Sequence, residues 1–487
     1  MRNIDPDLIM PGARLQGMDL SEANLVGVNL IGANLSQANL HSAFLGKANL
    51  SQADLSGADL TNANLMGTKL KQADLSRAIL LNCSMQGADL SGATLAGAEI
   101  KLGNGLFGAN LSGANLEFTV MKGNYIENAN LGDANMQGVD LEGTSLIQCN
   151  LKKANLQSAR MIKTDFGGAD LTDADFRNAE INSTDFSMAK MEGVDFHNTR
   201  LDENTQIENR YRLVWEIVNH GAITRDLTRS DLTQACLSYT NFENAILREA
   251  TLIRANFEHA NLNGTDFSKS NCEKINFSNA RTQNTNFSLA NLKGANISNI
   301  NLIGCNMILV NFKDVISDEG TRMDPKWRVV MMAINQGAER QDRSNMDLSQ
   351  AYLAEAKMSY CNLSNTNLSY SYLQKADLWN ANLTGANLER CNLVETGFRW
   401  AIMQKTNLRG TNMERASLFG ADLQGADLHK ANLTGADLEA AKLEGADFTG
   451  VDLSQARLVG TKITEHQLLS AASIIGVPLP DGRVIPE

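Results

Sequence analysis

An apolar residue recurs at every fifth position along most of the chain. Leu15, Leu20 and Leu25 begin the series, and the residue two places before each such centre is nearly always small, as Ala33 is before Leu35. Asn or Asp usually stands between the small residue and the centre, and the two residues that follow the centre are mostly polar or small. The repeating unit is therefore Ala-(Asn/Asp)-Leu-x-x, and a fixed internal period predicts an array of small structural units.

A period of five excludes the two common regular elements. On an α-helix, five residues advance about 140° beyond one full turn, so the centres would scatter around the helix instead of forming a stripe. On a flat strand, side chains alternate with a period of two, so every second centre would face outward. All centres can face inward only if the chain bends once per unit, closing a coil and stacking coil on coil. The Asn or Asp before each centre suits such turns, because these residues tolerate left-handed backbone and form local hydrogen bonds.

The pattern is kept in four registers. Their centres run from Leu15 to Ile100, from Leu106 to Leu201, from Leu227 to Phe312 and from Leu348 to Ile463. Only Cys272 and Thr282 replace an apolar residue at a centre. One residue is inserted between the first two registers, within 101–105, and we expect a bulge at a coil corner there.

Two longer breaks, 205–222 and 321–338, resemble each other in sequence. Their apolar residues follow helical spacing, so each break predicts one amphipathic helix of about three turns. Asp324 followed by Pro325 predicts a capped helix start. Each helix is either a cap over the edge of a coil or a hinge or docking element for a partner. Because Trp and Arg are enriched in binding hot spots, the helices supply the candidate protein-binding residues. These are Tyr211, Arg212, Trp215, Trp327 and Arg328.

The array ends at Ile463 and is followed by a helix-start pattern. Thr464 and Gln467 have the spacing of a capping box, and Leu468 and Leu469 offer a short apolar face. Solenoids need closed ends, so we expect a short C-terminal helix and tail that cover the last coil.

With this motif, the chain from Ala13 to Ile463 resembles the pentapeptide-repeat family. The resemblance implies an all-β solenoid, a right-handed quadrilateral β-helix with four five-residue units per coil. Residues 20 positions apart should then stack inside the coil. The expected pairs are Phe166 with Phe186, Phe176 with Phe196, Phe257 with Phe277 and Phe267 with Phe287.

The helical breaks resemble those of large family members of cyanobacterial type. The expected organisation begins with an N-terminal cap and ends with a C-terminal cap and tail, with three β-helix blocks separated by two helical insertions. The ranges in chain order are 1–11, 12–201 with a register slip near 101–105, 202–226, 227–312, 313–343, 344–463 and 464–487.

Charge and composition narrow the classes of partner. The chain has 55 acidic and 43 basic residues, a net charge of −12, and no basic stripe, so we expect no direct nucleic-acid binding. No stretch approaches the roughly 20 apolar residues of a membrane span, and residues 1–11 do not look like a signal peptide. The seven cysteines do not form a disulfide framework, so we expect a cytoplasmic protein without membrane partners.

The sequence offers no recognisable catalytic or metal-binding constellation. The six histidines show no zinc-site spacing with one another or with cysteine. Most cysteines take the small position before a centre and are expected to be buried apolar side chains, as at Cys83, Cys149, Cys305, Cys361 and Cys391. No group of residues provides a nucleophile, a base and an oxyanion site. We therefore expect no enzymatic activity, no cofactor and no metal.

The leading hypothesis is a non-enzymatic solenoid scaffold for intracellular protein–protein interaction, with regulation as one possible role, an unknown protein partner and an unknown oligomeric state. Solenoids offer long regular surfaces of this kind. The family resemblance supplies a second hypothesis, an acidic DNA-mimic rod that binds DNA gyrase or another type II topoisomerase. A passive structural spacer is the third.

Overall fold

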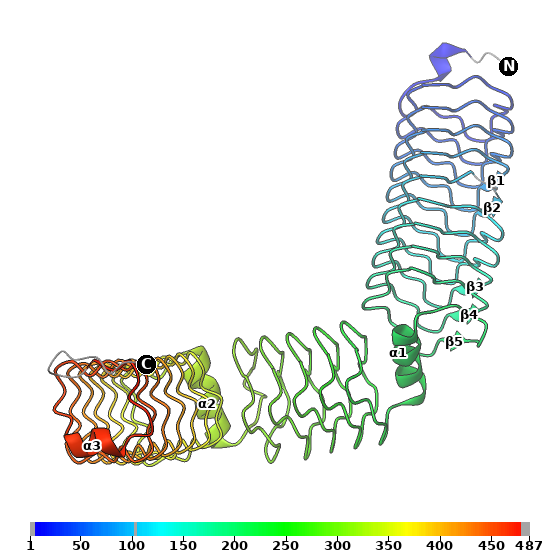
Figure 1. Ribbon diagram of the computed structural model, residues 1–487. Helices are drawn as coiled ribbons and strands as arrows, with labels where there is room; N and C mark the ends of the chain where they lie inside the picture. The colour runs from blue at the N-terminus through cyan, green and yellow to red at the C-terminus, as the bar shows by residue number, and fades with distance from the viewer. Residues whose placement is uncertain (1–4, 102–104, 479–487) are drawn as a thin grey trace. The chain divides into compact units, whose positions relative to one another are not determined.

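The computed structural model describes residues 5–101 and 105–478, which wind as stacked coils (Figure 1). The described helices are short: η1 (Pro6–Leu8), α1 (Asn209–His220), α2 (Pro325–Asn335) and α3 (Glu465–Ser470). The described strands are β1 (Ile79–Leu81), β2 (Glu99–Lys101), β3 (Arg160–Ile162), β4 (Glu180–Asn182) and β5 (Arg200–Leu201). β1 pairs with β2, and β3, β4 and β5 form a second sheet, all in parallel. Elsewhere, single parallel bridges join the coils.

The chain divides into two compact units. The first is Met1–Gly221 with Leu232–Leu237, and the second is Ala222–Asp231 with Ser238–Glu487. The first unit holds the first block and α1, and the second holds most of the second block, the third block, α2 and α3. Parts of the expected N-terminal cap, register slip and C-terminal tail, namely 1–4, 102–104 and 479–487, lie outside the described residues.

Neighbouring coils pair with a step of 20 residues. Asn34 bridges Arg14 on one side and Asp54 on the other. The Asn34 N–H donates to the Ala13 carbonyl at 2.8 Å, and the Leu35 N–H donates to the Asp54 carbonyl at 2.6 Å. Four pentapeptides therefore make one coil, and stacking satisfies backbone groups that a single coil would leave open.

The described bridges of the first block show a change of step near residues 101–105. Asp74 bridges Thr94, a step of 20 residues, but Asp89 bridges Asn110, a step of 21. The pairing returns to 20 residues between Asn110 and Asn130. The extra residue is thus absorbed within one coil, and the coils on both sides keep the same spacing.

Each corner is a tight turn whose left-handed residue lies two places after the centre. The Ala38 N–H donates to the Leu35 carbonyl at 3.0 Å, and Gln37 has a φ of 58°. A type II β-turn requires positive φ at this third residue. The sequence interpretation placed the left-handed backbone at the Asn or Asp before the centre, and this was wrong. Asn34 lies in the extended bridge, and its Oδ1 accepts the Ser36 N–H at 3.0 Å.

The centres and the small residues before them form the core, where aromatic columns run along the stack. The rings of Phe166 and Phe186 stack with centroids 5.2 Å apart, and those of Phe267 and Phe287 stack at 5.3 Å. The other two expected pairs are also in contact, with centroid distances of 5.9 Å for Phe176–Phe196 and 5.7 Å for Phe257–Phe277. The predicted 20-residue stacking is confirmed, and these rings are packing residues of the core.

Polar residues at the small position are satisfied by the preceding coil. Thr68 Oγ1 donates to the Leu45 carbonyl at 2.9 Å, and the Cys83 thiol donates to the Leu60 carbonyl in the same way. Burial raises the pKa of the Cys83 thiol to about 12, and it does the same for Cys272 at a centre. These thiols stay protonated near neutral pH, whereas the thiolate is the nucleophilic form of cysteine.

Within residues 5–101 and 105–478, no helix has both the length and the apolar character that crossing a membrane requires.

Candidate binding surface

α1 lies at the end of the first block and places three of the sequence-predicted residues against the last coil (Figure 1). Tyr211 is only 6 % exposed, and its hydroxyl donates to Glu192 Oε1 at 3.1 Å. Burial raises the pKa of this hydroxyl. Arg212 Nη2 donates to the Thr205 carbonyl at 2.7 Å.

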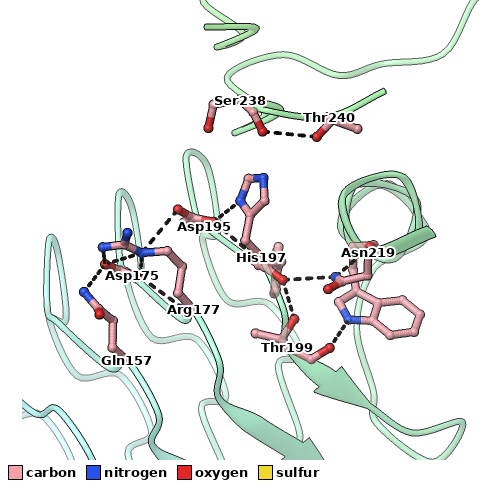
Figure 2. Close-up of polar contacts among 11 residues, drawn as sticks. Gln157, Asp175, Arg177, Asp195, His197, Thr199, Asn219, Ser238 and Thr240 are labelled. Atoms are coloured by element: carbon pink, nitrogen blue, oxygen red, sulfur yellow. Dashed lines mark hydrogen bonds and ion pairs between the residues drawn. The ribbon is translucent and has the colours of Figure 1, made fainter. Parts of the chain in front are cut away.

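Trp215 completes this contact between α1 and the coil. Its Nε1 donates to the Thr199 carbonyl at 3.2 Å. Asn219 Nδ2 donates to the Phe196 carbonyl at 3.0 Å (Figure 2). In the interior of a block, the carbonyl at the small position accepts an N–H of the next coil, as that of Ala179 does from Arg200 at 3.0 Å. At the end of the first block Trp215 donates to the Thr199 carbonyl, and Asn219 adds a donor to the Phe196 carbonyl, which also accepts from Thr199, so these contacts favour a capping role for α1.

α2 makes the corresponding contacts in the second unit. Trp327 is 8 % exposed, and the ammonium of Lys326 lies 4.9 Å from the ring centroid. Arg328 Nη2 donates to the Thr321 carbonyl at 2.9 Å, and Asn335 Nδ2 donates to the Phe312 carbonyl at 2.9 Å. The helix starts at Pro325 as expected.

Asp324 precedes α2 but does not cap it through its side chain. Its Oδ2 instead accepts the Gly304 N–H at 3.1 Å. Asp324 therefore stands at the expected N-cap position, but its carboxylate bonds an N–H of the preceding coil instead of the first turn of α2. The contacts of α1 and α2 favour the capping interpretation, and partner binding by their five candidate residues stays a prediction.

α3 closes the last coils with a different side chain. Thr464 and Gln467 form the expected capping box. Gln467 is buried, and its Nε2 donates to the carbonyls of Leu443 at 2.8 Å and Ala446 at 3.0 Å. Leu469, expected on an apolar contact face, is exposed. Closure by α3 thus depends on a polar donor that the apolar pattern did not indicate.

A second group of aromatic and arginine side chains lies on one outer corner of the third block. We call it the aromatic corner. It consists of Arg340, Tyr360, Trp379, Arg399, Trp400 and Phe419. These residues occupy the first or second turn position after a centre, on successive coils. Turn residues point away from the core, so aromatic side chains in these positions remain at the surface.

Three rings of the aromatic corner are exposed, Phe419 is half-buried, and the four rings form two contacting pairs. Tyr360 is 41 % exposed, Trp379 42 % and Trp400 49 %. The centroids of Tyr360 and Trp379 are 4.9 Å apart at an interplanar angle of 65°, and those of Trp400 and Phe419 are 5.3 Å apart at 85°. Edge-to-face pairs of this kind are favourable beyond simple burial, so the rings hold one another in place.

The backbone beneath the corner fixes these rings further. The Tyr360 N–H donates to the Trp379 carbonyl at 2.8 Å, and the Trp400 N–H donates to the Phe419 carbonyl at 3.0 Å. A Cβ added to Gly420 would lie 2.4 Å from Cε3 of Trp400. Glycine at this position lets the indole lie directly against the next coil.

Both arginines of the aromatic corner lie over rings. Arg340 Cζ is 4.9 Å from the centroid of Tyr360, and Arg399 Cζ is 4.9 Å from the centroid of Phe419. Cation–π contacts of this kind orient a guanidinium without neutralising it. Both arginines are exposed. Considering the described residues only, neither guanidinium is within ion-pair distance of a carboxylate.

Sequence reasoning missed the aromatic corner because it concentrated on the helical breaks. A signal was present: Arg340, Tyr360 and Trp400 lie at multiples of 20 residues from one another, and Trp379, Arg399 and Phe419 also lie 20 apart. Residues with that spacing share one corner. Reading the turn positions at this period would have found the group.

Asp195 and His197 form a different polar cluster near the end of the first block (Figure 2). Asp195 Oδ1 lies 2.5 Å from His197 Nδ1, and Asp195 Oδ2 lies 3.7 Å from Arg177 Nε. Burial alone would raise the pKa of Asp195, but hydrogen bonds from the side chain and backbone of His197 lower it overall.

Cys236 joins this cluster, and its sulfur lies within 4.8 Å of ligand atoms of both Asp195 and His197. Sequence spacing gave no sign of this group, because Cys236 is far from the other two in the chain. Arg177 beside the carboxylate opposes a bound cation, since like charges repel. The contacts of Asp195 with His197 and Arg177 account for its position without a metal ion.

Comparison with known proteins identifies the repeat. A family model described as "Pentapeptide repeats (8 copies)" matches most of the chain. The matched residues are 9–37, 33–72, 68–101, 106–138, 134–173, 159–198, 226–264, 270–307, 347–382, 371–410, 403–435 and 431–465. No curated protein matches the chain.

Several solved structures are similar. HetL, a pentapeptide repeat protein involved in heterocyst differentiation regulation from the cyanobacterium Nostoc sp. strain PCC 7120, is 23 % identical over 60 % of this chain and 88 % of its own, with a TM-score of 0.17. Rfr23 from the cyanobacterium Cyanothece 51142 is 31 % identical over 26 % and 84 %, with a TM-score of 0.18. QnrB1, a plasmid-mediated fluoroquinolone resistance protein, is 17 % identical over 38 % and 94 %, with a TM-score of 0.20. Such low scores do not support an argument from overall shape.

Proposed function

This chain belongs to the pentapeptide-repeat family, and we propose that it is a non-enzymatic scaffold that binds another protein through the aromatic corner of its third block. The observation that supports the proposal is the exposure of Tyr360, Trp379 and Trp400 on adjacent coils. Other large side chains, such as Phe118 and Tyr239, are also exposed, but the corner brings several exposed rings together on adjacent coils. An exposed group of such residues is typical of an interaction site.

The chemistry of the aromatic corner suits protein recognition. Trp, Tyr and Arg are the residue types most enriched in binding hot spots. The rings already contact one another and the backbone, so binding would cost little additional side-chain ordering. Covering the exposed ring surface would contribute about 25 cal/mol for each Å² of apolar area removed from water.

The proposal is tested by identifying a partner and measuring its affinity with purified components. Proteins captured from the native cells by the full chain are identified, purified and titrated by calorimetry against the wild type and the double variant Trp379→Ser/Trp400→Asn. Asn tolerates the left-handed backbone of Trp400, whose φ is 60°. Tyr239→Asn is the matched control, because Tyr239 is an exposed turn residue with a φ of 59° in the second block.

We expect the double variant to bind the partner at least about tenfold more weakly and the control variant to bind like the wild type. Equal affinity of the double variant, or no protein that binds the purified chain, would refute the proposal. If binding is instead lost in Trp215 or Trp327 variants, the helices are the binding elements.

The other roles considered from the sequence lead to different results. A DNA mimic that binds a type II topoisomerase would inhibit purified gyrase in a supercoiling assay, and a passive spacer would tolerate loss of the aromatic corner in cells. We propose the cytoplasm as the location of the scaffold, which localisation of a tagged full-length chain would test.

A further inference from the structure

The two arginines of the aromatic corner have a defined separation along the stack. Arg340 and Trp400 are three 20-residue steps apart, and Arg399 precedes Trp400 directly. Each guanidinium lies over a ring of the following coil, Arg340 over Tyr360 and Arg399 over Phe419. Each guanidinium is displaced by one coil in the same direction, so the two charges remain three coils apart. At about 4.8 Å per coil, this separation is about 14 Å.

The exposed rings of Trp379 and Trp400 lie on the two coils between the guanidinium over Tyr360 and the guanidinium over Phe419. The aromatic corner therefore presents an apolar surface with a cation at each end. Apart from Arg399, the arginines within 344–463 lie within 4.0 Å of a carboxylate, as Arg409 does of Asp427 at 2.9 Å. Glu439, the acid on the coil after Phe419, already pairs with Arg457. The charges of Arg340 and Arg399 are thus available to an anionic ligand.

An extended peptide matches this arrangement. Strand residues advance about 3.3 Å each, so two residues four positions apart are about 13 Å apart. Side chains at the first, third and fifth positions of a strand point to the same face. Carboxylates at the first and fifth positions would reach the two arginines, and an apolar side chain at the third would lie over the rings.

We propose that the aromatic corner binds an extended segment of a partner protein in which two carboxylates four residues apart flank an apolar side chain. This inference rests on the proposed function and specifies the chemistry of the partner. Charge complementarity favours an acidic protein segment over a basic one.

A synthetic peptide tests the proposal without knowledge of the natural partner. The probe is a ten-residue peptide containing Glu-Ser-Phe-Ser-Glu between glycine and serine residues. One comparison peptide has Gln at both Glu positions, and another has the same composition with the two Glu residues adjacent. Binding to the full chain is followed by calorimetry up to about 1 mM peptide, the range expected of a weak isolated segment.

The protein variants separate the aromatic corner from overall charge. Arg340→Gln/Arg399→Gln removes both cations of the corner. Arg409→Gln/Arg415→Gln removes two exposed arginines from other corners and gives the same net charge. Circular dichroism and thermal unfolding check that each variant retains the coil.

We expect the Glu-Ser-Phe-Ser-Glu peptide to bind the wild type and the control variant equally, and the corner variant at least about tenfold more weakly. The Gln peptide and the peptide with adjacent Glu residues should also bind at least about tenfold more weakly. Equal binding of either comparison peptide, equal binding by the corner variant, or no binding of the probe would overturn the inference. Preferential binding of oligothymidylate, or self-association through this corner in sedimentation experiments, would overturn it in favour of another occupant.

The two proposals can fail separately. If the purified natural partner depends on Trp379 and Trp400 but the probe peptide does not bind, the corner is a binding surface and the proposed peptide chemistry is wrong. If the probe binds and no partner depends on those tryptophans, the chemistry is right and the scaffold role is wrong.

Discussion

α1 and α2 lie 116 residues apart in sequence and close their coils with the same polar contacts. Asn219 and Asn335 both donate to the carbonyl of a core phenylalanine in the last coil, at 3.0 and 2.9 Å. Arg212 and Arg328 both donate to a threonine carbonyl seven residues earlier. The apolar partners differ, because Tyr211 in α1 corresponds to Trp327 in α2, and Trp215 corresponds to Met331.

The comparison shows which features of an end cap are fixed. Every coil has the same backbone, so the coil next to each helix presents its carbonyls in the same places, where donors of the helix can reach them. The ring or thioether that fills the remaining space needs no partner at a fixed place, because apolar packing is not directional. The two helices share their polar donors and differ in their apolar residues. We expect the same of any helix that packs on such a coil, because the backbone carbonyls that it meets lie in the same places.

Loss of the buried indole of α2 should have the largest effect. Trp327→Ala should destabilise the coil beneath α2 by about 3–5 kcal/mol, because it removes a buried ring and leaves a cavity. Amide hydrogen exchange of the coil around Phe312 measures this loss. Leu469→Ala, at an exposed position of α3, is the control and should change stability by less than about 0.5 kcal/mol. A loss below about 1 kcal/mol for Trp327→Ala would mean that α2 is not a cap.

The two asparagines should differ although their hydrogen bonds match. Asn219 is half-buried and Asn335 is exposed, so water can replace the second donor more readily. Asn219→Ala should cost about 1–3 kcal/mol and Asn335→Ala about 0.5–1.5 kcal/mol in the exchange free energy of the adjacent coil. The prediction fails if Asn335→Ala has the larger effect.

Trp215 offers a smaller test, since its indole N–H has no counterpart at Met331. Trp215→Phe keeps an aromatic ring but removes the donor to the Thr199 carbonyl. We expect a loss of about 1 kcal/mol, measured as protection of the amides in that coil. Met331→Phe puts the same ring at the corresponding position of α2 without removing a donor. A greater loss there would show that ring shape outweighs the hydrogen bond.

The smallest expected effect is a pH dependence shared by both ends. Asp202 Oδ1 accepts the Ser183 N–H at 2.8 Å, and Asp318 Oδ1 accepts the Asn299 N–H at 2.8 Å. The hydrogen bond from Asn299 lowers the pKa of Asp318. Burial opposes the shift at Asp202, but hydrogen bonds from Ser183 and Thr205 lower its pKa overall.

Because both pKa values are lowered by folding, the stabilisation is present above the unfolded value of about 3.9 and is lost as pH falls through the folded values. Thermal unfolding at pH 7 and pH 3 measures this loss. Asp318→Asn should narrow the difference between the two pH values relative to the wild type. An unchanged difference would show that this carboxylate does not contribute to the pH dependence.

Much of the interior could be predicted from the sequence. The five-residue period required every centre to face inward, and a 20-residue coil placed Phe166 against Phe186. The position of the positive-φ residue in each turn could not be predicted from the five-residue period. Gln37, Lys47 and Gln52 adopt positive φ although none is a typical turn residue, because the stacked coils hold each corner in one conformation. Local preference is a weaker influence than that constraint.

The candidate site was less accessible to sequence reasoning. The tryptophans of the two helices are predicted from the sequence as binding residues. In the structure, Trp327 is buried and Trp215 donates to a coil carbonyl. Residue type indicated that these side chains matter and could not distinguish packing from recognition. That distinction depends on exposure, which is a property of the folded coil.

The sequence by itself determined the coil, because a periodic pattern of side-chain size and polarity has one arrangement that buries every centre. Only the tertiary structure decided which backbone carbonyls Asn219, Asn335 and Gln467 contact, and which aromatic residues meet at an outer corner. The physical reason is distance along the chain: periodicity specifies a residue's relation to its near neighbours, whereas satisfaction of a backbone group and exposure of a ring depend on atoms brought together from different coils.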